Sequence, residues 1–142
     1  MITLTPLTRF NWENYLSIEL TEAQQQYVPS VLYSLAQAKF ENLFPFGIDY
    51  EGVEIGFLMY GDFNGICWLN RLMIDRRYQQ KGLGKQAVWA FIRQMQSNPR
   101  FREIRTSYVR NNIEAALLFE SLGFEIINEA LSQEIVAVLN LD

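Results

Sequence analysis

Two glycines flanked by two lysines form the part of this sequence best suited to chemistry. Gly82 and Gly84 lie two residues apart, between Lys81 and Lys85. Glycines let a backbone come close to an anion, and the free amides at the start of a helix point at it. An apolar run precedes this segment and a helix-like pattern follows it. The segment therefore predicts a phosphate-binding turn between a strand and a helix.

The residue types that are missing limit the chemistry. The chain has no histidine and one cysteine, Cys67. Acid–base catalysis must then use carboxylates, tyrosines, water or the substrate itself. A lone cysteine excludes an internal disulfide and offers no metal cluster, and its position in an apolar run predicts a buried strand residue. No metal site is expected.

Two familiar phosphate-binding patterns fit the glycine segment poorly. The Walker loop needs four residues between its glycines and a Ser or Thr after its lysine, whereas one residue separates these glycines and Gln86 follows the lysine. The dinucleotide fingerprint matches residues 82–87 in letters, with Glu103 at a plausible ribose distance. However, residues 75–81 separate the expected strand end at Ile74 from Gly82. A nicotinamide-dependent oxidoreductase is therefore the weaker alternative.

A third pattern, Gln/Arg-x-x-Gly-x-Gly/Ala after a strand and a charged turn, is matched in full by residues 79–84. Residues 112–124 match Asn-x-x-Ala-x-x-x-Tyr followed by Gly-Phe, except that Phe119 replaces the tyrosine. With both segments in order and one strand between them, the chain resembles the GNAT superfamily of acetyl-CoA-dependent N-acetyltransferases. Residues 56–61, 68–71 and 78–85 look most like its bacterial diamine (spermine/spermidine) acetyltransferase branch.

This resemblance implies a reaction and a cofactor site. An acetyl group would pass from acetyl-CoA, as co-substrate, to a primary amine of a small molecule, with polyamines as one class. The backbone of residues 80–85 would hold the CoA pyrophosphate, and a main-chain amide near Met73 would polarise the thioester. Asn112 could instead serve only as a helix N-cap, and the lysines only as solvated surface. The expected cofactor contacts are Leu72, Met73, Ile74, Gln79, Gln80, Lys81, Gly82, Leu83, Gly84, Lys85, Asn112 and Phe119.

Two positions depart from the family pattern. Phe119 has no hydroxyl with which to protonate the leaving thiolate, and Asn70 stands where diamine acetyltransferases often carry a carboxylate. Tyr108 is the candidate substitute acid, and Glu22 a candidate base through water. A regulatory or non-catalytic CoA-binding homologue is the alternative. The acidic, aromatic N-terminal segment is the expected acceptor wall, with Glu19, Glu22 and Tyr33 as substrate candidates and Trp12, Tyr15 and Tyr27 as further aromatics that could stack on a cation.

Charge falls into three blocks. Residues 1–65 carry eight acids and two bases, residues 66–110 ten bases and two acids, and residues 111–142 six acids and no base. The basic middle suits a polyphosphate and the acidic ends suit a cationic partner. Because the bases coincide with the glycine segment and the pI is about 4.9, no nucleic-acid partner is expected.

Length and composition predict one globular domain over residues 1–142. Apolar residues make up 49% and charged residues 20% of the chain, as in ordinary soluble proteins. No apolar run approaches the roughly 20 residues of a membrane helix, and the N-terminus lacks a secretory pattern. A cytoplasmic location without a membrane partner is expected. In this family the C-terminal strands often pair between subunits, so a homodimer is a further expectation.

Periodicity and turn residues predict the elements that must position these groups. The expected order is β-α-α-β-β-β-α-β-α-β-β, an α/β fold. The resemblance sharpens this to a GNAT-like domain with a mixed, mostly antiparallel sheet of about six or seven strands flanked by four helices. A turn is expected at residues 61–65, and Gly123 is expected to end the last helix in the left-handed conformation. Strands are expected at about residues 2–7, 45–50, 53–60, 66–74, 101–109, 124–128 and 134–141, and helices at about 8–20, 29–41, 84–96 and 112–122.

Overall fold

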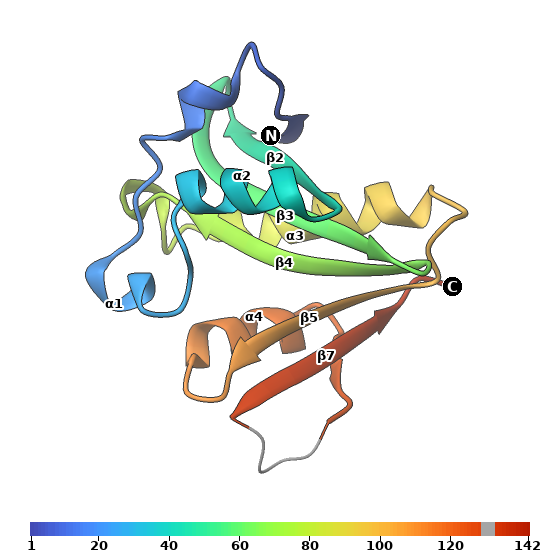
Figure 1. The fold of residues 1–142 in the computed structure, drawn as a ribbon. Coiled ribbons are helices and arrows are strands. Elements are labelled where there is room, and N and C mark those ends of the chain that lie inside the picture. The colour runs from blue at the N-terminus through green and yellow to red at the C-terminus, as the bar shows by residue number, and fades with distance from the viewer. Residues whose placement is uncertain (129–132) are drawn as a thin grey trace.

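A mixed sheet of seven strands forms the framework, in the order β1-β2-β3-β4-β5-β7-β6 (Figure 1). The computed structural model describes residues 1–128 and 133–142. All neighbouring strands are antiparallel except β4 and β5, which are parallel. This confirms the predicted α/β fold. The strands are β1 (Ile2–Pro6), β2 (Leu43–Tyr50), β3 (Val53–Phe63), β4 (Ile66–Ile74), β5 (Glu103–Val109), β6 (Glu125–Ile126) and β7 (Glu134–Asn140).

In the residues that the structure describes, four α-helices and two short 3-10 turns cover the sheet. The helices are α1 (Glu22–Gln25), α2 (Val31–Phe40), α3 (Leu83–Gln96) and α4 (Ile113–Ser121), and the 3-10 turns are η1 (Trp12–Tyr15) and η2 (Arg76–Tyr78). Helix α2 crosses one face of the sheet and α3 lies behind the other (Figure 1). None of the helices in the described ranges combines the length and the apolar character needed to cross a membrane.

Each face of the sheet carries its own buried cluster. In β3, Phe57 and Met59 belong to the cluster that includes α2, whereas Leu58 between them belongs to the cluster that includes α3. This alternation follows from the two-residue period of a strand. Cys67 is fully buried in β4 as predicted, and burial raises the pKa of its thiol to about 12, so the thiol is protonated and inert.

The two parallel strands separate soon after they pair. Cys67, Trp68 and Leu69 pair with residues 104–106, and neither strand pairs with the other beyond that point. At the branch, the Thr106 hydroxyl donates a hydrogen bond to the Leu69 carbonyl (2.9 Å). Figure 1 shows β4 and β5 diverging from there. The facing backbone edges of both strands are therefore left open to a ligand.

The predicted helix over residues 8–20 is wrong. Only η1 forms there, and the short α1 that follows was not predicted. Tyr15 packs over Gly47, where an added Cβ would lie 2.1 Å from its ring, and its hydroxyl donates to Asp49 (2.7 Å). Ile18 and Leu20 are also buried against the sheet. These long-range contacts hold the segment in an irregular path, overriding local propensity.

The predicted turn at residues 61–65 is shorter than expected. Strand β3 continues to Phe63, and only Asn64 and Gly65 have the positive φ values of a tight turn. The other predicted elements are present with small shifts at their ends. Ser30 caps α2, and Gly123 ends α4 with a φ of +93°. These local signals were reliable because caps and turns depend on neighbouring residues only.

Candidate active site

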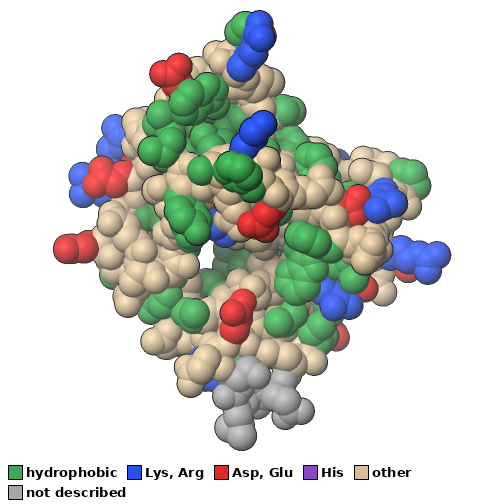
Figure 2. Space-filling view, viewed as in Figure 1, with side chains coloured by type: hydrophobic (Ala, Val, Ile, Leu, Met, Phe, Trp, Pro, Cys, Tyr) green, Lys and Arg blue, Asp and Glu red, His purple; other side chains and the backbone are tan. Residues whose placement is uncertain are grey.

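A cavity of about 470 Å³ lies where β4 and β5 separate. Its walls come from β4, the loop before α3 with the start of that helix, β5, α4 and the segment around α1. In the space-filling view the molecule is hollowed between the part with α1 and α2 and the part with α4 and β5 (Figure 2). The size and the mixture of apolar and polar walls suit a small-molecule site.

A β-bulge in β4 lies beside this cavity. Met59 pairs with Arg71 and Tyr60 pairs with Leu69, so Asn70 is an extra residue without a partner in β3. Bulges bend a strand and redirect its side chains. The bulge therefore bends β4 next to the branch and turns Asn70 and Arg71 toward the cavity, which both of them line.

The loop before α3 presents a row of free amides. Gln80 and Gly82 both have positive φ values, +60° and +76°. Among the described residues, no acceptor receives a hydrogen bond from the amides of residues 80–85, and the first helical bond runs from the Gln86 amide to the Gly82 carbonyl (3.1 Å). A Cβ built on Gly82 would meet nothing within 4 Å, so the space above the loop is open. This cradle fits a diphosphate.

The two lysines beside the cradle differ in position. Lys85 lines the cavity, whereas Lys81 lies over the Tyr78 ring, 5.8 Å from its centroid, and does not line it. Of the ten basic residues in 66–110, several are paired with acids: Arg76, Arg77, Arg100 and Arg105. The basic block therefore contributes less charge to the cradle than its composition suggested.

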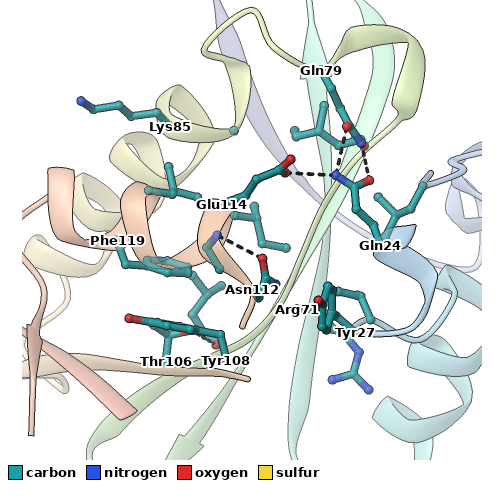
Figure 3. A pocket seen from close by; sticks show the side chains of 18 of the residues that line it. Gln24, Tyr27, Arg71, Gln79, Lys85, Thr106, Tyr108, Asn112, Glu114 and Phe119 are labelled. Carbon is teal, nitrogen blue, oxygen red and sulfur yellow. Dashed lines mark hydrogen bonds between the residues drawn. The ribbon is translucent and has the colours of Figure 1, made fainter. Parts of the chain in front are cut away.

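Gln24 joins three elements across the mouth of the cavity (Figure 3). Its Nε2 donates to Gln79 Oε1 (3.1 Å) and to Glu114 Oε2 of α4 (3.2 Å). Gln79 Nε2 donates back to Gln24 Oε1 (2.8 Å) and to the Ile74 carbonyl (2.8 Å). The Gln79 side chain thus closes the turn after β4 and connects it to α1.

Asp75 ties the N-terminal segment to the same turn. This carboxylate is 1% exposed and accepts hydrogen bonds from the amides of Glu19 (3.0 Å) and Arg77 (2.9 Å) and from Arg77 Nε (2.8 Å). Burial alone would raise the pKa of Asp75, but these hydrogen bonds outweigh it and hold the pKa below its usual value. The charged carboxylate is therefore a fixed part of the structure.

Helix α4 contributes Asn112 and Phe119. The Asn112 side chain accepts a hydrogen bond from the Ala115 amide (3.2 Å), so it is an N-cap, and it also lines the cavity (Figure 3). The Phe119 ring stacks on Tyr108, with centroids 6.0 Å apart and planes at 12°. Burial and, to a lesser degree, Glu120 raise the pKa of Tyr108, so its phenol keeps its proton at neutral pH.

Most of the predicted cofactor residues are brought together, and two are not. Met73 is 2% exposed and packs in the cluster under α2. The Asp75 amide bonds to Ile55 of β3 (2.7 Å), so by strand alternation the amide of Met73 also faces β3. The amides of Leu72 and Ile74 then face the gap. Lys81 is the second predicted cofactor residue that does not line the cavity. The predicted residues that line it are Leu72, Ile74, Gln79, Gln80, Gly82, Leu83, Gly84, Lys85, Asn112, Phe119 and the candidate acid Tyr108.

The substrate candidates lie outside the cavity. Glu19, Glu22 and Tyr33 are not among its lining residues in the described ranges, and Tyr33 is 60% exposed on α2. Tyr27, Val28 and Pro29, which lie between α1 and α2, line the cavity instead. In Figure 3, Tyr27 lies on the opposite side of Asn112 from Phe119. Arg71 and Gln24 were missed. Arg71 carried a signal, because a charge in an otherwise apolar strand needs a reason.

Comparisons with known proteins agree with this geometry. The model of the "Acetyltransferase (GNAT) family" matches residues 6–124. The chain is 35% identical over 137 residues to the spermine/spermidine N(1)-acetyltransferase of Bacillus subtilis (strain 168), with 90% of each chain covered.

Two solved structures share the fold. The ribosomal-protein-S18-alanine N-acetyltransferase of Escherichia coli superposes with a TM-score of 0.76 at 19% identity, covering 99% of this chain and 94% of that one. The spermidine N-acetyltransferase of Vibrio cholerae, in complex with CoA and spermine, superposes with a TM-score of 0.75 at 15% identity, covering 99% and 95%.

Proposed function

This chain belongs to the GNAT acetyltransferase family and is an N-acetyltransferase that uses acetyl-CoA, and we propose that its acceptor is a polyamine. The observation that carries the proposal is the 35% identity to a spermine/spermidine acetyltransferase over 90% of both chains. Glu114 lines the cavity, which gives a cationic acceptor one acidic neighbour.

The proposed cofactor site uses mainly backbone groups. The free amides of residues 80–85 would hold the pyrophosphate, supported by the open space over Gly82 and by Lys85 on the wall. The edge of β4 that faces the gap would pair with the pantetheine arm as an added strand does. The Leu72 or Ile74 amide would then polarise the thioester carbonyl. Asn112 lines the cavity while its Oδ1 keeps the capping bond.

The proposed reaction is direct attack by an uncharged amine. The nitrogen lone pair forms a bond to the thioester carbonyl carbon, the carbon–sulfur bond breaks, and one proton leaves the nitrogen while one joins the sulfur. Phe119 has no hydroxyl to supply that proton. Tyr108 stacks on Phe119 and keeps its proton at neutral pH, which supports it as the candidate acid. Water is the other source.

Three wider expectations stay predictions. A single domain is supported by the continuous sheet from β1 to β6, which includes elements from both ends of the chain. A cytoplasmic location is supported by dependence on acetyl-CoA, an intracellular metabolite. A homodimer would be tested by sedimentation of the purified protein.

The test is an acetylation screen read by release of free CoA. Purified protein and acetyl-CoA are incubated with spermine, spermidine, an aminoglycoside, amino acids and peptides with a free N-terminus. We expect the highest kcat/KM with a polyamine. A higher kcat/KM with peptides or aminoglycosides would contradict the proposed acceptor. Thermal stabilisation by acetyl-CoA without turnover on any amine would instead indicate a CoA-binding module.

A further inference from the structure

The bulge residue Asn70 has an unusual environment. Its side-chain Oδ1 is buried and has no hydrogen-bond partner among the described residues. Asn70 itself lines the cavity. Buried polar atoms are nearly always paired, so an unpaired acceptor in a residue that lines a cavity points to a ligand that donates to it. The terminal amide torsion of asparagine is soft, so a contact from Oδ1 to such a ligand would require only a turn about χ2.

Arg71, the next residue, is a partly buried cation on the same wall. Its Nε donates to Ser34 Oγ (3.0 Å), one Nη to Gln37 Oε1 (2.5 Å) and the other to the Asn70 carbonyl (2.9 Å). All three acceptors are neutral. Within the described ranges no carboxylate lies within ion-pair distance of Arg71. The guanidinium therefore keeps its full positive charge beside Asn70.

The surrounding charges do not cancel this cation. The Gln37 side chain lies between Glu41 and Arg71. Its Nε2 donates a hydrogen bond to Glu41 (3.0 Å), and its Oε1 accepts one from Arg71. Burial lowers the pKa of Arg71, and Tyr33 and Glu41 oppose that shift, so it is still charged at neutral pH. The other titratable groups on the cavity walls are Tyr27, Tyr78, Lys85, Tyr108 and Glu114.

We propose that Asn70 and Arg71 form the position of the reacting amine, with Asn70 Oδ1 accepting an amine N–H and Arg71 favouring the uncharged amine. This rests on the proposed N-acetyl transfer. An ammonium beside Arg71 is repelled, so the amine loses its proton to water on binding and needs no carboxylate base. Its lone pair is then free to attack the thioester carbon, and the second amine proton leaves to water as the thiolate departs.

This assignment explains how the reaction proceeds without histidine and without a carboxylate at the bulge. Arg71 replaces a general base, because its fixed positive charge favours the uncharged form of the bound amine before the attack. Asn70 orients the amine, and Arg71 determines that the amine is uncharged. In a polyamine, the remaining ammonium groups lie farther along the cavity, toward Glu114.

The test uses whichever amine has the highest turnover in the screen, so its outcome does not depend on the acceptor being a polyamine. For the wild type, kcat measured at saturating amine falls below an acid-limb midpoint set by the protonation of the bound amine. In Arg71→Gln that midpoint rises by about one pH unit. Arg71→Lys, the control that retains the charge, keeps the wild-type midpoint. An unchanged midpoint in Arg71→Gln would overturn the proposal.

Asn70 variants separate its role as an acceptor from a merely structural one. Asn70→Ala raises the KM for the amine about tenfold and leaves the KM for acetyl-CoA unchanged. Asn70→Asp keeps the acceptor oxygens but neutralises Arg71, so the amine KM is retained and the midpoint moves to higher pH. An unchanged amine KM in Asn70→Ala, or loss of amine affinity in Asn70→Asp, would contradict the assignment.

A binding measurement covers the case in which no amine turns over. Spermidine is titrated into the protein with CoA by calorimetry at pH 7 in two buffers of different ionisation enthalpy. We expect about one proton released per spermidine bound, and less in Arg71→Gln. Binding without proton release would overturn the inference, whereas absence of spermidine binding or failure of turnover would count only against the proposed function.

Discussion

The two sides of the cavity present different chemical groups, backbone amides on one side and side chains on the other. The proposed cofactor side consists of the loop of residues 80–85, the start of α3 and the open edge of β4, and it offers mainly backbone amides. The proposed acceptor side consists of Tyr27, Val28, Pro29, Asn70 and Arg71, and it offers side chains. Backbone groups suit a ligand that is always the same. Side chains can be exchanged without rebuilding the fold, which suits a variable acceptor.

Polar contacts join the two sides at the end of β4. Asp75 holds the Glu19 amide of the N-terminal segment, and the Arg76 amide donates to the Glu19 carbonyl (2.8 Å). Gln24 of α1 reaches Gln79 and Glu114. The acceptor side is therefore positioned by the cofactor side, although its own helix α1 has only four residues. Three variants test this division, beginning with the largest expected effect.

Gly82→Asp should damage the cofactor side most. A carboxylate in the cradle repels the diphosphate, and we expect acetyl-CoA affinity to fall about 100-fold. Gly82→Asn has the same shape without the charge and tolerates a positive φ, so it should lose far less. Gly52→Asp, at a turn with a similar φ of +79° and outside the cavity, should not change acetyl-CoA affinity. Calorimetric titration measures all three. Equal losses in Gly82→Asp and Gly82→Asn would contradict charge repulsion.

Asp75→Ala should loosen the connection between the sides. It removes hydrogen bonds to a buried carboxylate, and we expect the free energy of unfolding to fall by about 2 kcal/mol. Because the pKa of Asp75 is lowered in the folded protein, its contribution is complete above the unfolded value of about 3.9 and is lost as pH falls through the folded pKa. Urea unfolding between pH 3 and 7 measures both effects.

Asp62→Ala is the matched control, because Asp62 also pairs with an arginine, Arg100, but outside the cavity. We expect a smaller loss of stability and no change in the amine KM, whereas Asp75→Ala should raise that KM. Equal behaviour of the two variants would show that Asp75 does not position the acceptor side.

Gln24→Ala should have the smallest effect. Its bonds to Gln79 and Glu114 cross the mouth of the cavity at partly exposed positions, so their loss should change the acetyl-CoA dissociation rate about two- to threefold. Stopped-flow displacement measures that rate. Gln26→Ala is the control, because Gln26 is exposed and does not line the cavity in the described structure. A larger effect of Gln26→Ala would indicate that α1 as a whole, rather than the bridge, controls exchange.

The success of sequence reasoning differed between the two sides for a physical reason. The glycine cradle was predicted because its geometry is local: positive φ values, free helix-start amides and a strand end all follow from consecutive residues. The helix predicted over residues 8–20 was wrong because Tyr15, Ile18 and Leu20 find their partners far away in the sheet. Glu19, Glu22 and Tyr33 were predicted from composition, which does not tell where a side chain points.

The sequence by itself determined the order of the elements, the glycine turn before α3, the N-cap at Asn112 and the absence of histidine and of a hydroxyl at Phe119. Only the tertiary structure decided that β4 and β5 separate after three pairs, that Asn70 is a bulge and that Arg71 has only neutral partners. Strand register and side-chain pairing depend on residues distant in the chain. Such contacts form only when the whole sheet has assembled, so no local pattern encodes them.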